Sequence, residues 1–293
     1  MLTFLLLASW AGPVAPLPQP STPTTVTILY DAFGRSPGLA RDWGFAALIE
    51  YQGKRILFDT GNNAALFMQN VQRLHVDLTK LDLVVVSHRH SDHVAGLSAV
   101  LHVNPDVPVY APREPFGIFG SDIPGTFYRP DPSLPDSMRY LNGVVPEVIR
   151  AGTLWPAAHL IVVDTSMVIA PGIRLVSLVS DSPGTRELRE LSLVLTTPSG
   201  SIVIVGCSHP GVERILVAAS ADGVPVRVLL GGLHQVATPD SVLVPLAHRL
   251  RSQWQILMIA PGHCTGEPAF AALRKEFGDD YIYAGLGERI TLP

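Results

Sequence analysis

The chain has only two cysteines among its 293 residues, so a framework of disulfides cannot hold its fold together. Basic clusters are also missing. The net charge is −4 and no run of Lys or Arg indicates a nucleic-acid partner. Charged residues make up only 16% of the chain and hydrophobic residues 47%, a balance that excludes extensive disorder. What remains is one large α/β domain with a substantial core.

A long apolar run is absent as well. The apolar N-terminal stretch, residues 2–11, is too short to span a bilayer, so no stable membrane span is expected. It is typical instead of the core of a secretory signal, and a proline-rich stretch follows it. We predict a leader and linker over residues 1–24, export to the periplasm or the medium, and a catalytic domain over residues 25–293. Without a working leader the protein would stay in the cytoplasm.

The sequence does contain a cluster of metal-ligand residues directly after an apolar run. The stretch LVVVSHRHSDHV, residues 83–94, predicts a buried strand that leads into a helix beginning at its end. Residues i and i+2 of an extended segment share a side, so His88 and His90 are suited to one metal. Asp92 and His93 follow at the turn and are suited to a second.

Three further histidines follow apolar runs and lie among glycines. His209 follows VIVGCS, His234 follows VLLGGL and His263 follows MIAPG. Catalytic residues collect where the strands of a sheet end, so these histidines are candidates to complete the site. The remaining four histidines lack this context, and we interpret them as ordinary surface or core residues.

Alternating strand and helix patterns predict two sheets face to face with helices outside. They are interrupted by a proline-rich, irregular segment from about residue 112 to residue 171. Long irregular segments inside a compact domain are usually functional, and we predict that this one forms a lid over the metal site. The alternative is a surface excursion packed by its own aromatic residues.

The combination of HRHSDH with DTG at residues 59–61 and glycine-preceded histidines downstream resembles the metallo-β-lactamase superfamily. More narrowly, GCSHPG at 206–211, GGLH at 231–234 and GHCTG at 262–266 resemble its dihydropterin synthase-like branch. The resemblance covers about residues 26–290. It implies an α/β fold of the αββα sandwich type, with two mixed sheets, outer helices and a dinuclear metal site at the sheet edge.

The resemblance also implies which residues bind the metals. It assigns His88 and His90 to one metal. It assigns Asp92, His93 and His263 to the other. Zinc is the first choice for both, with manganese or iron as alternatives, because the same ligands suit all three metals.

Two positions depart from the family pattern. The usual third-motif histidine would fall near Asp181, and the usual bridging aspartate near Cys207. Either these two residues serve as ligands or His209 takes over the duty of one of them, and we favour His209. Export would also allow a disulfide between Cys207 and Cys264, which would otherwise be thiols or soft ligands.

We therefore expect a hydrolase that uses a metal-bound hydroxide on a small-molecule substrate, such as a phosphate ester or a related ester or lactone. Asp92 would orient the nucleophile and take up its proton, and His234 would donate to the substrate or leaving group. One alternative is a transferase that condenses a dihydropterin diphosphate with an aminobenzene ribofuranosyl phosphate. Another is a non-catalytic metal-binding or redox protein. The sequence does not indicate the oligomeric state.

Overall fold

The computed structural model describes residues 23–114 and 157–293 without interruption. Between these ranges it describes residues 122–127, 132–133, 135, 138–139, 143–144, 147–150 and 155. The predicted leader and linker thus lies almost wholly outside the described residues. Within the described part, no helix is both long enough and apolar enough to cross a membrane.

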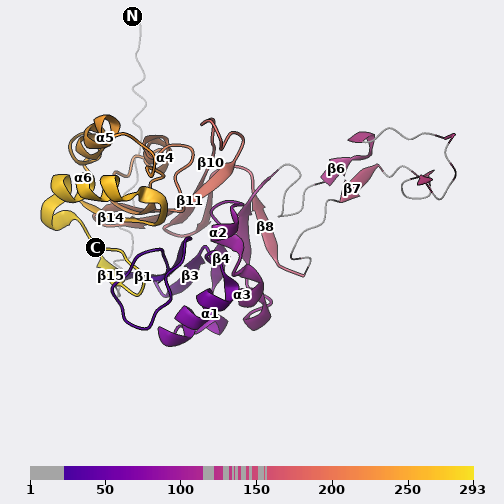
Figure 1. The fold of residues 1–293 in the computed structure, drawn as a ribbon, viewed down its shortest axis with the longest axis horizontal. Coiled ribbons are helices and arrows are strands. Elements are labelled where there is room, and N and C mark those ends of the chain that lie inside the picture. The colour runs from indigo at the N-terminus through magenta and orange to yellow at the C-terminus, as the bar shows by residue number, and fades with distance from the viewer. Residues whose placement is uncertain are drawn as a thin grey trace, which may run out of the picture.

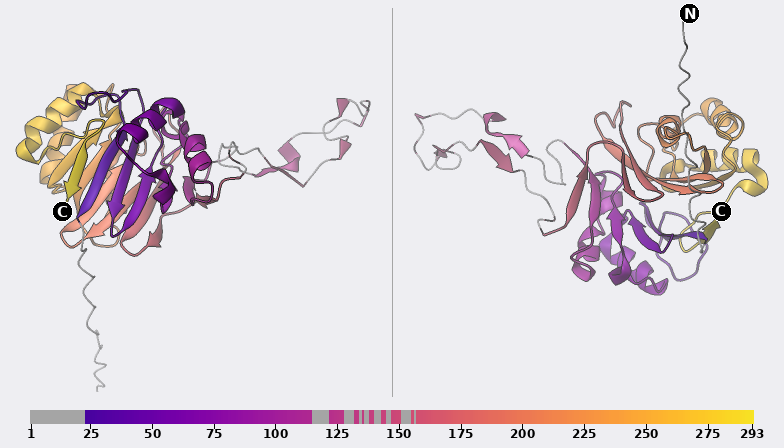
Figure 2. Two further views of the ribbon diagram at one scale, coloured as in Figure 1. Left: turned by 90° about the horizontal axis from the view of Figure 1, so that it is seen from below. Right: turned by 180° about the vertical axis from the view of Figure 1, so that it is seen from behind.

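Two mixed β-sheets lie face to face at the centre of the molecule (Figures 1 and 2). The first has the strand order β15-β1-β2-β3-β4-β5-β8 and the second β14-β13-β12-β11-β10-β9. The strands of the first sheet are β1 (Thr24–Tyr30), β2 (Ala46–Tyr51), β3 (Lys54–Phe58), β4 (Leu83–Val85), β5 (Val109–Pro112), β8 (Leu160–Val163) and β15 (Arg289–Leu292). Those of the second are β9 (Met167–Ala170), β10 (Ile173–Val179), β11 (Arg189–Thr197), β12 (Gly200–Val205), β13 (Val226–Gly232) and β14 (Met258–Gly262).

Helices cover the outer face of each sheet, which gives four layers in the order αββα (Figure 1). Those on the first sheet are α1 (Ala64–Arg73) and α3 (Leu97–Val103), and those on the second are α4 (Val212–Ala219), α5 (Asp240–Ser252) and α6 (Glu267–Phe277). The short pieces are α2 (Ser91–Val94) and the 3₁₀ turns η1 (Leu78–Lys80), η2 (Gly125–Phe127), η5 (His263–Thr265) and η6 (Gly278–Asp280). The predicted sandwich is confirmed.

Apolar residues fill the spaces between all four layers. Ile49 and Phe58 of the first sheet meet Leu193 and Leu230 of the second in the central core. Strands buried on both faces carry near-continuous apolar runs, and every residue of β12, GSIVIV, is buried. This packing fixes where each strand ends, and therefore where the polar residues that follow it lie.

The segment after α6 returns the chain to the first sheet. Tyr281 forms a bridge with Ile259, and the chain then continues to β15 at the edge of the first sheet. The backbone amide of Leu286 donates to the carbonyl of Phe33, just after β1, and that of Gly287 donates to the carbonyl of Ile28 in β1. These two hydrogen bonds hold the chain beside β1 before β15 begins.

The predicted lid, residues 112–171, is shorter than the sequence indicated, and much of it lies outside the described residues. β8 and β9 fall within the predicted range, but each pairs with a strand of a main sheet. β6 (Asp122–Pro124) and β7 (Val148–Arg150) pair with each other and lie apart from the sheets (Figures 1 and 2). A lid formed by the intervening residues stays a prediction.

Candidate metal centre

The candidate ligands lie where strands of both sheets end. β3 and β4 run parallel in the first sheet, and β12, β13 and β14 run parallel in the second. Parallel neighbours have their carboxyl ends at one edge, so the residues that follow them meet there. The structure brings together the histidines that the sequence places after β4, β12, β13 and β14.

Two groups of ligand atoms lie side by side at this edge. His88, His90 and His209 form the first, and the donor atoms of the three side chains lie within 4.8 Å of one another. Asp92, His93 and His263 form the second by the same measure. The rings of His88 and His93 have their centroids 4.1 Å apart and join the two groups.

The helix that carries part of this set begins earlier than predicted. α2 starts at Ser91 rather than near Val94, with His90 at its N-cap. Asp92 and His93 therefore lie in the first turn of the helix. His93 points into the protein and is fully buried, whereas Asp92 keeps partial contact with solvent.

Asp59 orients the histidines that follow β4. Its buried carboxylate accepts hydrogen bonds from the Ser87 amide, the Ser87 hydroxyl and Nδ1 of His93, each at 2.7 Å. Because the Ser87 hydroxyl donates to Asp59, its oxygen is free to accept from Nδ1 of His88 at 2.8 Å. Such contacts fix the orientation and tautomer of metal-binding histidines.

Glu190, in β11, does the same for His209. Its buried carboxylate accepts hydrogen bonds from the backbone amides of Cys207, Ser208 and His209 and from Nδ1 of the His209 ring. Burial favours the neutral acid, but these hydrogen bonds outweigh it and lower the pKa of Glu190. The carboxylate thus holds the loop after β12 and aims the His209 ring.

The backbone of the site is unusual. Eight non-glycine residues in the described part of the chain have positive φ, and four of them, Asp59, Ser208, His234 and His263, lie at this edge. Left-handed backbone is disfavoured for residues with a Cβ, and it collects at functional sites. The folded sheets hold these four residues in that conformation.

The charges at the site favour a cation. Burial and the neighbouring rings lower the pKa of His90 to about 4 and that of His88 well below its usual value, so both rings are neutral near pH 7. Burial also opposes charge on His93, but the Asp59 carboxylate raises its pKa to about 9. Asp92 stays ionised, because contact with His263 outweighs its burial.

The ring geometry fits bound metal. Nδ1 of His88 donates to Ser87, so Nε2 of this neutral ring carries a lone pair. Nδ1 of His93 donates to Asp59, so its Nε2 is the atom that a metal would bind after displacing the proton there. Nε2 of His88 lies 3.1 Å from Nδ1 of His90, and Nε2 of His93 lies 3.2 Å from Nε2 of His263. These ring nitrogens lie close enough together to bind one cation between them once they are deprotonated.

Comparisons with known proteins agree with this geometry. A model of the β-lactamase superfamily domain matches residues 54–132. The chain is 25% identical, over 88% of its length and 94% of the other protein, to 7,8-dihydropterin-6-methyl-4-(β-D-ribofuranosyl)-aminobenzene-5′-phosphate synthase of Methanocaldococcus jannaschii. A solved metal-dependent hydrolase of the β-lactamase superfamily superposes with a TM-score of 0.65 at 22% identity, over 92% of this chain and 99% of that one. These matches identify a β-lactamase superfamily domain over residues 54–132 and support the metallo-β-lactamase superfamily for the chain as a whole.

Its similarity extends well beyond the metal motif. The metallo-β-lactamase fold protein YhfI of Bacillus subtilis superposes over 92% of this chain and 98% of its own, with a TM-score of 0.57 at 15% identity. The whole two-sheet body is therefore that of a metallo-β-lactamase fold. Together with the candidate ligands at one edge, the matches support an enzyme of this superfamily, and the match to the archaeal synthase supports the dihydropterin synthase-like branch.

The two positions at which this chain departs from the family pattern differ in their surroundings. The Asp181 side chain is 82% exposed, pairs with Arg214 and belongs to none of the ligand groups among the described residues. Cys207 is buried, with its Sγ 3.2 Å from Nε2 of His93, and can join His88 and His93 in a third group. The geometry agrees with His209 as the ligand that takes over from one of these two positions. Cys207 lies between the two ligand groups, next to His88 and His93.

The disulfide that export would allow between Cys207 and Cys264 is not formed in the structure, where both cysteines are free thiols. Both are buried, and their sulfurs form a further group with the exposed ring of His234. The His234 ring also lies 4.4 Å from that of His209. The structure therefore places His234 beside the candidate ligands, where a role in contacting substrate stays a prediction.

Sequence reasoning missed the carboxylates that hold the ligands. Asp59 belongs to the DTG motif, whereas Glu190 and Asp31 belong to none of the motifs that carry the resemblance. Asp31 is buried after β1, and its carboxylate accepts from the His263 amide at 2.9 Å. Asp31 and Asp59 both follow strands, the signal that identified the histidines. Glu190 lies within a strand and had no such signal.

Gly206 provides a test of this supporting shell. A Cβ on Gly206 would lie 2.2 Å from the Ser87 hydroxyl and 3.2 Å from the Asp59 carboxylate. We expect Gly206→Ala to lower the free energy of unfolding by about 1–3 kcal/mol, measured by chemical denaturation, and to weaken metal binding. Gly223→Ala strains a backbone with φ of 82° but contacts nothing, so it should affect stability alone. Equal metal affinity in both variants would contradict this reading of Ser87 and Asp59.

Proposed function

We propose that this protein is a hydrolase of phosphate esters, or of a related small-molecule ester or lactone, that depends on two divalent metal ions. His88, His90 and His209 would hold one ion, and Asp92, His93 and His263 the other. The observation that carries the proposal is the pair of adjoining ligand groups, each with its donor atoms within 4.8 Å. Zinc suits these nitrogen and oxygen ligands, as do manganese and iron.

When bound, such a pair of ions lowers the pKa of water and neutralises charge on the oxygens of the substrate. The remaining tasks fall to the side chains. Asp92, ionised and partly exposed, orients the attacking water and takes up its proton, while its Oδ2 faces Nε2 of His263 at 3.3 Å. His234 lies exposed beside His209, where its ring donates to the substrate or the leaving group.

A phosphate ester is favoured over other esters by the archaeal relative, whose name describes a product that carries a 5′-phosphate. The same name supports an alternative, a transferase that joins a dihydropterin diphosphate to an aminobenzene ribofuranosyl phosphate. Export would separate the protein from intracellular cofactor synthesis and favour the hydrolase. A mature N-terminus near Pro16, found in protein from its native host, would support export and the hydrolase together.

Metal removal tests the hydrolase. Phosphodiesters, phosphomonoesters, carboxylic esters and lactones bearing chromogenic groups are assayed before and after dialysis against a chelator. We expect phosphate-ester hydrolysis to fall by on the order of 10³-fold, because two cations contribute several kcal/mol to the transition state. Zinc, manganese or iron(II) should then restore it. Metal-loaded protein that hydrolyses none of the four classes, or activity that chelation leaves intact, would overturn the proposal.

A further inference from the structure

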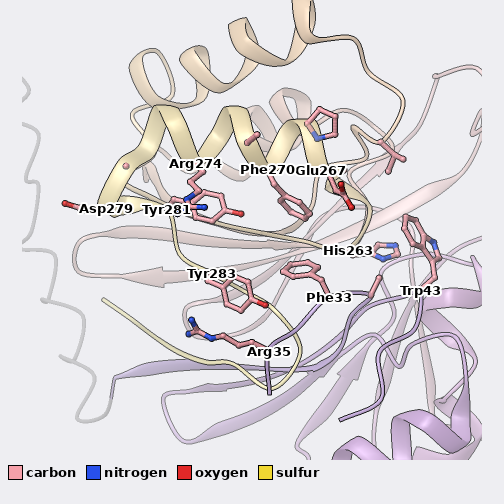
Figure 3. A pocket seen from close by; sticks show the side chains of 16 residues that line it. Phe33, Arg35, Trp43, His263, Glu267, Phe270, Arg274, Asp279, Tyr281 and Tyr283 are labelled. Atoms are coloured by element: carbon pink, nitrogen blue, oxygen red, sulfur yellow. The ribbon is translucent and has the colours of Figure 1, made fainter. Parts of the chain in front are cut away.

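A large cavity extends from the candidate metal centre along α6 (Figure 3). Its volume is about 1140 Å³, enough for a substrate of two or more rings. His263 lines one end, so the cavity and the metal ligands share a wall. Five of its sixteen lining residues are aromatic in a chain that is only 7% aromatic, so the cavity is not an ordinary surface depression.

The middle of the cavity is a set of partly exposed rings. Phe33, from the loop after β1, packs edge-on against Phe270 of α6 with a centroid distance of 5.1 Å. It also packs edge-on against Tyr283, at 5.7 Å. All three remain partly accessible, and Figure 3 shows their rings grouped together between α6 and the first sheet. Such rings offer faces and edges to a planar aromatic guest.

Trp43 stands at the end of the cavity next to the metal ligands. Its side chain is 48% exposed, and its ring lies 5.1 Å from that of His263. The backbone next to Trp43 is closely packed, because a Cβ on the following Gly44 would lie 2.5 Å from the backbone oxygen of Asp92. An exposed indole held against a candidate ligand is well placed to cover a ring bound beside it.

The far end of the cavity carries Arg274. Glu267, Phe270 and Arg274 follow one another on one face of α6, and seven residues of helix separate the first from the last by about 10 Å. Arg274 forms no ion pair with any residue that the structure describes, whereas Arg35 is paired with Glu288. Glu267 and Asp279 also line the cavity, and Figure 3 shows Asp279 at the same end as Arg274, so an anion is favoured only in direct contact with the guanidinium.

We infer that this cavity binds the non-reacting part of the substrate, and that this part is a planar aromatic system with an anionic group at its far end. The ring system lies among Phe33, Phe270 and Tyr283, under the edge of Trp43. The anionic group lies at Arg274, about two helical turns from the reacting ester. The inference rests on the proposed function for the position of that ester.

Binding of three phosphonates to the full-length, metal-loaded protein tests the inference. 2-Naphthylphosphonate, 6-carboxy-2-naphthylphosphonate and cyclohexylphosphonate cannot be hydrolysed and are titrated by calorimetry. We expect the naphthyl compound to bind about fivefold to tenfold more tightly than the cyclohexyl compound, and the carboxylate to add about tenfold. Equal or tighter binding of the cyclohexyl compound would show an unselective apolar cavity and overturn the inference.

Two matched variants locate the contacts. Arg274→Met and Lys275→Met each remove one positive charge from α6, but Lys275 does not line the cavity. Only Arg274→Met should abolish the gain from the carboxylate, and Trp43→Leu should weaken both naphthyl compounds alike. If Arg274→Met and Lys275→Met reduced the affinity gain from the carboxylate equally, the assigned position of the anionic group would be contradicted. If no phosphate ester is hydrolysed while these affinities hold, the proposed reaction fails and the cavity assignment stands.

Discussion

Replacing His90 with alanine is expected to lower kcat/KM for phosphate-ester hydrolysis by on the order of 10³-fold and to remove one metal ion per chain. His90 belongs to the group with His88 and His209, and its side-chain hydrogen bond among the described residues is with the candidate ligand His88. Its side chain is only half-buried, so its loss should leave the core intact. Metal content and steady-state kinetics, measured on one preparation, check both effects.

His102→Ala is the matched control. His102 is an exposed histidine of α3 that belongs to none of the ligand groups among the described residues, and it should keep both metals and full activity. An active His90→Ala protein with its metal content unchanged would show that the group after β4 is not a metal site. Circular dichroism of each variant separates a lost ligand from a lost fold.

Asp59→Asn is expected to weaken binding at the metal that His93 holds by about 10–100-fold. The carboxylate accepts from the Ser87 amide, the Ser87 hydroxyl and His93. The asparagine side chain keeps one oxygen that accepts hydrogen bonds. Its NH2 group, however, would face groups of Ser87 and His93 that themselves donate. It also removes the charge that raises the pKa of His93. Competition with a chromogenic chelator measures the affinity of each site.

The backbone does not confound this experiment. Asp59 has φ of 59°, and asparagine is among the few residues that adopt this conformation readily. Asp82→Asn is the control. The partly exposed carboxylate of Asp82 accepts hydrogen bonds from Lys54 and the Arg55 amide, and Asp82 belongs to none of the ligand groups among the described residues. Unchanged affinity in Asp59→Asn would mean that His93 is oriented without the carboxylate.

The sequence predicted the fold and the ligands from the same signal. Buried strands show as short apolar runs, and polar residues directly after them must lie at a sheet edge. This placed His88, His209 and His263 at one site although they lie far apart in the chain. The parallel pairing of β12, β13 and β14 then explains why three loops converge.

The support of the site could not be predicted in the same way. Glu190 holds His209 across neighbouring strands, and that contact depends on the register of β11 against β12 rather than on sequence spacing. Asp31 meets His263 only because two sheets pack face to face. The cavity along α6 had no signal either, because its rings come from the loop after β1, from α6 and from the segment before β15.

The central claim is that six side chains form two adjoining metal sites. Anomalous diffraction from crystals of metal-loaded protein tests it most directly. We predict two peaks per chain, one among His88, His90 and His209 and one among Asp92, His93 and His263. A single peak, or metal bound only by Cys207, Cys264 and His234, would contradict it.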